Sequence, residues 1–228
     1  MQAETNRARR AQEKTARLLA VASEIIRETG DFDLPMRELA ARAQVSLREP
    51  YQSFGSKAGI IMALLKADQA EFHEKVRTLQ SQDVLENIFD RVRIGVEFFD
   101  ENQAFYRALF RATQGFSGGD ETEPARENLR SFRSMARRAR REGYIEDDID
   151  PDALGETLTD IFAANLRTWA ASGFDIDLAY LKIGFGMAQL LTGAATTPHD
   201  ARMRERRREY QARIRAFESA SSQSEPRR

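Results

Sequence analysis

Apolar residues recur every three or four positions along almost the whole chain, as they do on one face of an α-helix. Alternating apolar and polar residues with many β-branched side chains, the pattern of a half-buried strand, are hard to find. The pattern predicts an all-α protein with about nine helices and an additional C-terminal helix.

Residues with strong capping preferences mark where these helices begin and end. Gly30 is a suitable stop for a first helix at about 13–29, and Pro35 fits the first position of a short second helix. Ser56 is placed to cap a long fourth helix. Later apolar stripes predict helices at about 85–99, 104–114, 124–142, 151–171 and 175–193, and a final helix with Met203, Tyr210, Ile214 and Phe217 on one side.

Two segments predict no regular structure. Residues 115–124, GFSGGDETEP, are rich in glycine and polar residues and predict a loop. Residues 220–228, ASSQSEPRR, predict a disordered end.

The short connection between the second and third predicted helices has the form of a helix-turn-helix. One helix ends with residues 39–43, residues 44–45 make the turn, and Ser46 opens the next helix. Ser46 and Glu49 fit a capping box, in which each side chain satisfies a free backbone N–H of the first turn. Pro50 disfavours helical geometry at Glu49, so a later start of the third helix stays open.

The side chains of this motif suit the grooves of duplex DNA. Arginine pairs with guanine, glutamine with adenine, and leucine contacts the methyl group of thymine. Tyr51, Ser56 and Lys57 suit phosphates, Ser56 by placing a helix N-terminus against the DNA backbone. For Tyr51 the alternative is plain packing, and for Arg37 it is a solvated helix surface. The residues expected to contact DNA are Arg37, Ser46, Leu47, Arg48, Tyr51, Gln52, Ser56 and Lys57.

Charge is segregated along the chain although the net charge is only −1. Arg7, Arg9 and Arg10 form a basic arm that adds sequence-independent attraction to DNA or reaches an adjacent minor groove. Residues 144–180 are instead strongly acidic, with Arg167 as their single basic residue. A polyanion is therefore attracted to the N-terminal end and repelled from this later segment.

The segment MRELAARAQVSLREPYQSFGSKAGII resembles the N-terminal signature of the TetR/AcrR family of bacterial repressors, whose usual pattern is an R-x-(I/L)-A helix, a turn ending in V-S, and T-L-Y-x-x-F-x-x-K. The similarity covers about residues 13–65. The matching residues are Arg37, Leu39, Ala40, Val45, Ser46, Tyr51, Phe54 and Lys57. Gln44 departs from the family's common glycine, so a left-handed turn there costs about 1 kcal/mol. Glu49 and Pro50 replace the common threonine and leucine.

The resemblance implies a homodimer joined through the eighth and ninth helices, a ligand cavity in the C-terminal domain, and DNA binding that the ligand affects. We expect a helix-turn-helix domain at residues 1–58, an effector-binding and dimerisation domain at 59–197, and an amphipathic helix with a tail at 198–228. Apolar stripes on the eighth and ninth helices predict a four-helix bundle between subunits. Its expected contact residues are Leu154, Leu158, Ile161, Leu178, Leu181, Phe185 and Ala188.

An effector pocket needs apolar walls with a few polar anchors. Asn165 shares a stripe with Phe162 and Trp169, and a buried amide needs a partner that a ligand or water supplies. Alternatively, Asn165 bonds a neighbouring helix or faces the dimer interface. Gly95 leaves room on the inward side of its helix. The expected lining residues are Phe98, Phe99, Phe105, Phe110, Phe162, Asn165 and Trp169, and for each aromatic the alternative is ordinary core packing.

Composition argues against an enzyme. The chain has no cysteine and two histidines, His73 and His199, which excludes thiolate chemistry and leaves little for zinc or a histidine base. No Ser-His-Asp order, phosphate-cradling glycine loop or metal-ligand cluster is found. We therefore expect no cofactor and no metal.

The chain also lacks an apolar stretch of about 20 residues and an apolar block after its charged start, which predicts a cytoplasmic protein without a membrane anchor. Two arginine-rich helices qualify this picture. The seventh predicts a solvated face, and the last docks on the body or the partner subunit, with an anionic membrane surface as the alternative.

The combined expectation is a ligand-responsive transcriptional repressor. It binds near-palindromic operator DNA as a dimer, with its recognition helices about 34 Å apart, and a small, largely apolar effector releases it. The alternative is a non-transcriptional DNA-associated protein without a switching ligand.

Overall fold

Ten α-helices make up most of the part of the chain that the computed structural model describes, residues 2–30, 33–77, 83–101, 103–114 and 123–224. The predicted all-α class is confirmed. Within these ranges the one pairing of β type is an isolated bridge between Ile145 and Ala195. No helix in the described ranges is both long and apolar enough to span a membrane.

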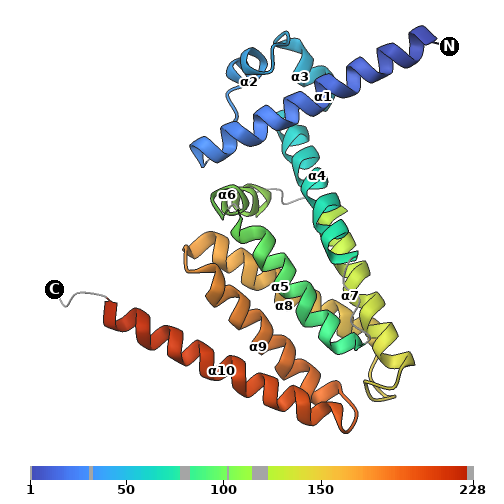
Figure 1. Ribbon diagram of the computed structural model, residues 1–228, viewed down its shortest axis with the longest axis vertical. Coiled ribbons are helices and arrows are strands. Elements are labelled where there is room, and N and C mark those ends of the chain that lie inside the picture. The colour runs from blue at the N-terminus through green and yellow to red at the C-terminus, as the bar shows by residue number, and fades with distance from the viewer. Residues whose placement is uncertain (1, 31–32, 78–82, 102, 115–122, 225–228) are drawn as a thin grey trace. The chain divides into compact units, whose positions relative to one another are not determined.

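The chain folds as two compact units. The N-terminal unit comprises the described residues within Met1–Glu71 and Asn102–Gly118, and the C-terminal unit those within Phe72–Glu101 and Gly119–Arg228. The helices of the N-terminal unit are α1 Gln2–Thr29, α2 Met36–Arg42, α3 Arg48–Phe54, α6 Gln103–Gln114 and most of α4 Lys57–Arg77 (Figure 1). The C-terminal unit holds the end of α4 and α5 Val84–Asp100, α7 Glu123–Arg141, α8 Pro151–Ser172, α9 Ile176–Ala194 and α10 His199–Ser224.

The N-terminal unit is built around α1, which packs against α2, α3 and α6. Leu18, Ala22 and Ile25 of α1 are buried, as their helical spacing predicts. The helix begins at Gln2 rather than near residue 13. Its first turns contain good helix formers and an Arg9–Glu13 ion pair at 3.5 Å. They have no apolar stripe, so the apolar pattern did not predict them as helix.

Aspartates cap three helices of the C-terminal unit, α5, α8 and α9. The Asp83 carboxylate accepts hydrogen bonds from the N–H groups of Leu85 and Glu86 at the start of α5. Asp150 and Asp175 cap α8 and α9 in the same way, and Gly173 ends α8 with a left-handed φ of 73°. These caps explain why the predicted bounds of α5, α8 and α9 lie within a few residues of the observed ones.

The arginines of α7 are exposed or half-buried, as the predicted solvated face requires, and several of them pair with acidic side chains. Arg137 contacts Asp152 of α8 at 2.6 Å, and Arg140 contacts Asp147 at 3.1 Å. Arg133 forms a further ion pair with an α8 glutamate. The basic helix and the acidic segment of the sequence are therefore neighbours that cancel much of each other's charge.

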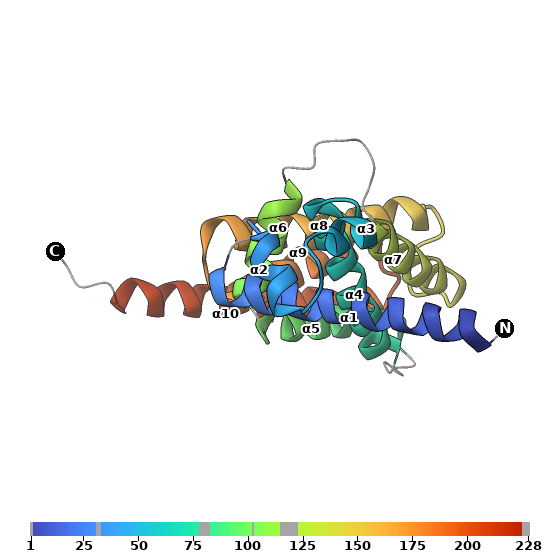
Figure 2. The ribbon, with the colours of Figure 1, turned by 90° about the horizontal axis from the view of Figure 1, so that it is seen from above.

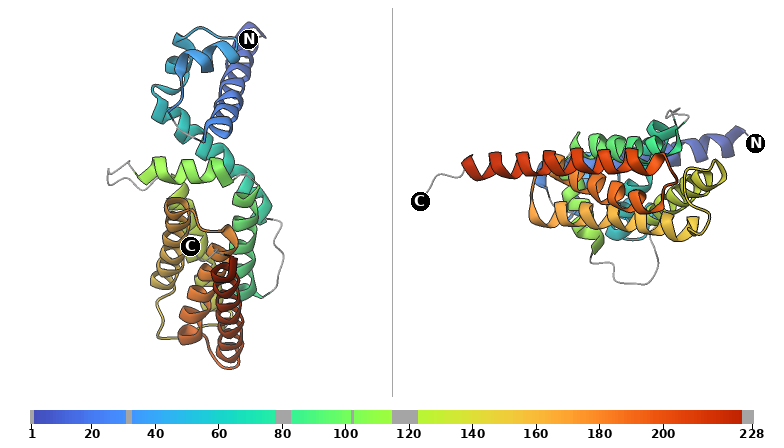
Figure 3. Two further views of the ribbon diagram at one scale, coloured as in Figure 1. Left: turned by 90° about the vertical axis from the view of Figure 1, so that its left-hand side faces the viewer. Right: turned by 90° about the horizontal axis from the view of Figure 1, so that it is seen from below.

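The last helix runs alongside α9, and its C-terminal end extends beyond the other helices of the unit (Figures 2 and 3). Met203 and Tyr210 are buried, whereas Ile214 and Phe217 are half-buried, so the predicted stripe docks only in part. The helix continues to Ser224, past the point where disorder was expected. Residues 225–228 and most of the expected loop, 115–122, lie outside the described residues.

Candidate functional site

The turn between α2 and α3 is closed by backbone hydrogen bonds. The N–H of Val45 donates to the carbonyl of Ala40 at 3.0 Å, and that of Gln44 to Ala41 at 3.1 Å, the two bonds of a Schellman motif. Gln44 has a φ of 54°, which is the left-handed conformation for which glycine is the usual residue. The strain expected at this departure from the family pattern is therefore present.

Helix α3 begins at Arg48, two residues after Ser46, so the capping-box prediction is wrong. Leu47 occupies the N-cap position without a side-chain cap, and the Glu49 N–H donates to the backbone carbonyl of Ser46 at 3.0 Å. The Glu49 carboxylate instead accepts a hydrogen bond from the Lys14 ammonium at 3.1 Å. The later start places Pro50 in the first turn, where a missing N–H leaves no intrahelical bond unmade.

The residues expected to contact DNA all lie on the exposed surface of the N-terminal unit. Leu47 and Tyr51, four positions apart, are each 46% exposed and are the large apolar side chains most exposed in the described part of the chain. Arg48 and Gln52 form a second exposed pair one position along. Two adjacent rows of base-reading side-chain types therefore face outward from α3. The further exposed residues of the set are Arg37, Ser46, Ser56 and Lys57.

Helix α4 follows α3 closely in the sequence, and its first turn has a defined cap. The Ser56 hydroxyl accepts a hydrogen bond from the Gly59 N–H at 3.1 Å, which confirms the predicted cap. The Lys57 ammonium contacts the Asp33 carboxylate at 2.7 Å. Its hydrogen bond and charge lower the pKa of Asp33. Lys57 thus exchanges one exposed anion for another if it binds a phosphate.

The basic arm is helical, because α1 includes it. Arg9 and Arg10 are exposed on this helix, and the side chain of Arg7 lies outside the described residues. A helix about 10 Å wide does not fit a minor groove about 6 Å wide. Of the two roles expected for the arm, sequence-independent attraction is the one that this conformation allows.

The residues expected to line an effector pocket fall into both units. Phe98, Phe162 and Trp169 are buried in the C-terminal unit, and Phe99 is half-buried there. In the N-terminal unit, Phe105 is buried with its ring edge-on to Tyr106 at 5.2 Å. Phe110 belongs to α6, but its side chain lies outside the described residues.

Asn165 is not the buried anchor that its stripe predicts. It is half-buried, and its amide donates to the backbone carbonyl of Ile161, one turn earlier on the same helix, at 2.8 Å. The buried stripe of α8 contains Leu166 at the adjacent position instead. A shift of one residue rotates a helical side chain by about 100°, which is enough to take it off the core face.

The buried polar residues of the described chain are Asn87 and Arg91, both on α5. They and Gly95 recur at intervals of four along one helix face. Arg91 is 2% exposed, and its guanidinium donates to the side-chain oxygen of Asn128 on α7 at 2.7 Å. Sequence analysis identified Gly95 but missed the two polar residues on the same stripe.

Aromatic rings surround the Arg91 side chain. Its guanidinium carbon lies 5.1 Å from the ring centroid of Phe72 and 5.4 Å from that of Phe132. A Cβ atom at Gly95 would meet Phe162 at 3.4 Å and Phe72 at 3.6 Å, so the glycine brings these rings close to α5. Burial lowers the pKa of Arg91 to about 10, against the charge of Glu127, which raises it. The guanidinium therefore remains protonated at neutral pH.

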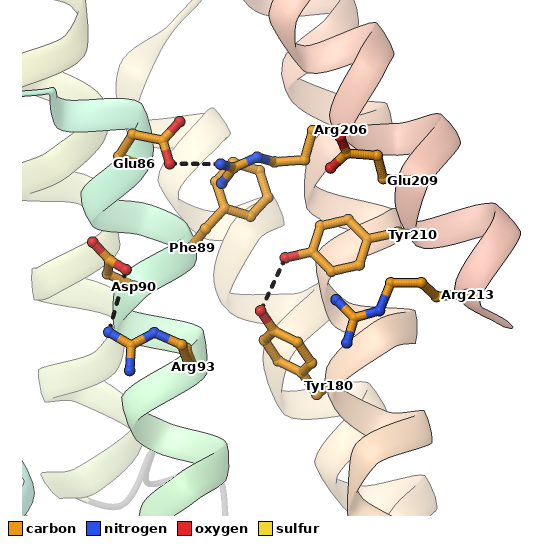
Figure 4. Close-up of a pocket in the computed structure, with 9 residues that line it drawn as sticks. All are labelled: Glu86, Phe89, Asp90, Arg93, Tyr180, Arg206, Glu209, Tyr210 and Arg213. Carbon is orange, nitrogen blue, oxygen red and sulfur yellow. Dashed lines mark hydrogen bonds and ion pairs between the residues drawn. The ribbon is translucent and has the colours of Figure 1, made fainter. Parts of the chain in front are cut away.

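A second polar region is a surface pocket of about 240 Å³ between α5, α9 and α10 (Figure 4). Across it, Arg206 contacts Glu86 at 2.6 Å, and the Tyr210 hydroxyl donates to that of Tyr180 at 3.3 Å. Burial raises the pKa of Tyr210, and its hydrogen bond to Tyr180 adds to the increase. A Cβ at Gly184 would meet the Tyr210 ring at 2.3 Å, so this glycine lets α10 lie close on α9. The Arg206–Glu86 ion pair and the Tyr210–Tyr180 hydrogen bond therefore hold α10 against α5 and α9.

Most of the expected dimer contacts are core residues of a single chain. Leu154, Leu158, Leu178, Leu181 and Ala188 are buried, whereas Ile161 and Phe185 are half-buried. Sequence analysis chose the stripes that face the chain's own core, because α8 and α9 are apolar over more than one face. The surface side of these helices carries Thr157, Ile161, Ala164, Thr168, Phe185, Gly186, Gln189 and Leu190.

In the described residues, no group of three or more histidine, cysteine, aspartate or glutamate side chains is arranged to hold a metal ion. No family model matches the sequence, and no curated protein matches it.

Solved structures do match the fold. A TetR-family transcriptional regulator from Pectobacterium atrosepticum is 25% identical with a TM-score of 0.70, over 83% of this chain and 97% of that one. TylP, a TetR regulator from Streptomyces fradiae, is 20% identical with a TM-score of 0.61, over 90% and 99% of the two chains. A γ-butyrolactone receptor is 17% identical with a TM-score of 0.57, over 90% and 99%.

Proposed function

Because this chain belongs to the TetR family of transcriptional regulators, we propose that it represses transcription by binding operator DNA as a homodimer and leaves the operator when a small effector binds the C-terminal unit. The observation that carries the DNA-binding role is the exposed face of α3. Leu47 and Tyr51 would each gain from burial against a base or sugar, and the neighbouring Arg48 and Gln52 would read base edges.

The test is selection of bound duplexes from a random pool by the full-length protein. We expect a near-palindromic sequence whose half-sites are separated by about one helical turn, because two recognition helices related by a twofold axis read both halves. Retention of DNA without any preferred sequence would favour the alternative, a DNA-coating protein without a switching ligand. Acting on chromosomal DNA places the protein in the cytoplasm, and this function needs no cofactor.

The dimer would form through the surface side of α8 and α9. Ala164, Thr168 and Gly186 are small, so they allow close approach of two helix pairs, and half-buried Ile161 and Phe185 supply apolar area. Ala164→Glu would place a charge in this contact, and Ala41→Glu, the same change on an exposed position of α2, is the control. Light scattering should report a dimer for wild type and Ala41→Glu and a monomer for Ala164→Glu. A monomeric wild type at micromolar concentration would contradict the proposed assembly.

A further inference from the structure

We propose that the effector is an organic anion, a carboxylate on an apolar or aromatic frame, and that Arg91 is the residue that pairs with its negative charge. The proposal rests on the proposed function, because it names the ligand class of the effector site in the C-terminal unit. It replaces the largely apolar effector that composition alone suggested.

Arg91 has no carboxylate of the described residues within ion-pair distance, and the charge of Glu127, which Arg130 contacts, acts on it from farther away. Its guanidinium donates to the side-chain oxygen of Asn128, a neutral amide. By contrast, Arg137 and Arg206, which are more exposed, both contact carboxylates. Removal of a charge from water is costly unless the charge is paired, so this arginine sits in a site that an anion would complete.

The surroundings of the guanidinium indicate the shape of this anion. Phe72 and Phe132 contribute aromatic faces, which attract a cation but accept no ordinary N–H hydrogen bond. A guanidinium has five N–H donors in one plane, and the Asn128 oxygen takes one of them. A planar carboxylate matches two parallel donors of such a group. Binding of this kind would hold the charged end of the ligand at Arg91 and Asn128.

The rest of the ligand would lie against apolar walls. The ring of Phe162 is 6.0 Å from that of Phe132, and Phe98 is 5.8 Å from Phe72. Gly95, one turn after Arg91, lets the rings of Phe162 and Phe72 lie close to α5 on the same face. An apolar or aromatic frame joined to one carboxylate fits this combination of rings and a single cation.

Through Phe72, ligand binding at Arg91 would affect the packing of α4. It lies on α4, the helix whose first turn contains Lys57. An anion that draws the Arg91 guanidinium toward itself changes the contact between Arg91 and Phe72. A ligand of this class therefore binds one arrangement of α4 better than another, which is what an effector must do.

The experiment compares matched acids and alcohols on the full-length protein. The probes are decanoate and naphthoate, each paired with its neutral alcohol, decanol and naphthylmethanol. Binding is followed by calorimetry and by the fluorescence of Trp169, the single tryptophan of the chain, which is fully buried in α8. We expect at least one acid to bind wild type about tenfold or more tighter than its alcohol.

Three variants assign the difference to Arg91. Arg91→Met keeps the length of the side chain and removes the charge, so it should weaken the acid about tenfold to hundredfold and leave the alcohol unchanged. Arg91→Lys keeps the charge without the planar donors and should recover part of the affinity. Arg93→Met, a change at an exposed arginine of the same helix, should alter neither. Circular dichroism of each variant checks that it is folded.

The proposal is overturned if neither acid binds wild type, if acid and alcohol bind equally, or if Arg91→Met weakens both alike. Release of the selected operator DNA separates it from the proposed function. A neutral alcohol that releases DNA from wild type and from Arg91→Met would sink the anion proposal and leave the regulator intact. An acid that binds through Arg91 and leaves operator affinity unchanged would support the anion site and contradict the switching function.

Discussion

The two units depart from the usual distribution of side chains in opposite directions. The N-terminal unit exposes Leu47 and Tyr51 at 46% each, whereas the C-terminal unit buries the Arg91 side chain to 2% exposure. Folded proteins normally bury large apolar side chains and leave charges in water. Such departures are expected where a partner completes the surface, which agrees with the DNA contact proposed for one unit and the anion proposed for the other.

A second arginine shows that burial near α5 does not by itself leave a charge unpaired. Arg206, in the pocket of Figure 4, contacts Glu86 and also lies 4.3 Å from the ring of Phe89. Arg91 has the aromatic neighbours of this arrangement without the carboxylate. The two sites therefore differ in whether a carboxylate contacts the guanidinium directly, and the following changes test this difference together with the exposed face of α3.

The largest effect is expected at Arg48. Arg48→Ala should weaken operator binding by about 1–3 kcal/mol and relax the preference at one base position, because a base contact is lost. Fluorescence anisotropy on the selected operator and its single-base variants measures both quantities. Lys57→Ala should weaken all sequences alike and reduce the salt dependence by about one ion, and Arg215→Ala on exposed α10 should do neither. Equal effects of Arg48→Ala on every sequence would contradict a base-reading role.

The next effect is a gain in stability at Arg91. Arg91→Met should raise the free energy of unfolding by about 1–2 kcal/mol in the absence of ligand, because it replaces a buried charge that no carboxylate contacts directly by an apolar side chain of similar length. Urea unfolding followed by circular dichroism measures the change. The same substitution at Arg93 should stay within about 0.5 kcal/mol. A large loss of stability in Arg91→Met would show that Arg91 holds the core together and has no need of an anion.

Replacement of Gln44 by glycine should give a gain in stability of less than about 1 kcal/mol. Gln44→Gly relieves the left-handed backbone conformation at a φ of 54°, and the greater freedom of glycine in the unfolded chain offsets part of this gain. Thermal unfolding of the full-length protein is the measurement, and Gln52→Gly, inside α3, is the control and should destabilise. A loss of stability in Gln44→Gly would mean that the glutamine side chain makes a contact worth more than the strain.

The smallest change in stability is expected where the apolar side chains are exposed. Leu47→Ser should alter the free energy of unfolding by less than about 0.5 kcal/mol, because the side chain leaves little core contact behind. It should nevertheless weaken operator binding measurably, since contact with the methyl group of thymine is lost. Comparison of unfolding and anisotropy data separates the two effects. A destabilisation above about 1 kcal/mol would place Leu47 in the core of the unit.

The sequence predicted the order of the helices well because their ends carry strong local signals. Pro35, Asp150 with Pro151, and Gly173 each act within one turn of their own position, so no knowledge of the rest of the chain is needed. The start of α3 was harder to predict, because Ser46 is a good N-cap residue whereas Pro50 disfavours helical geometry at Glu49. In the structure, the helix begins at Arg48, after Ser46.

Sites formed by several helices were predicted less well. Asn165 and Leu166 are adjacent, and a helix with apolar residues on several sides does not reveal which of them faces inward. For the same reason, Leu158 and Leu181 were assigned to a subunit contact although they form the core. Arg91 was missed because an arginine is seldom buried, although its spacing from Asn87 and Gly95 places all three on one face.

The ion pairs between α7 and α8 have a consequence for how such a regulator searches a chromosome. Arg137 and Arg140 already have anionic neighbours, so a phosphate backbone that approaches this part of the C-terminal unit finds little net attraction. Arg10 and Arg48, in the other unit, are exposed. Diffusional encounters through α7 should therefore be less favoured than encounters through the N-terminal unit, because acidic side chains mask arginines of that helix.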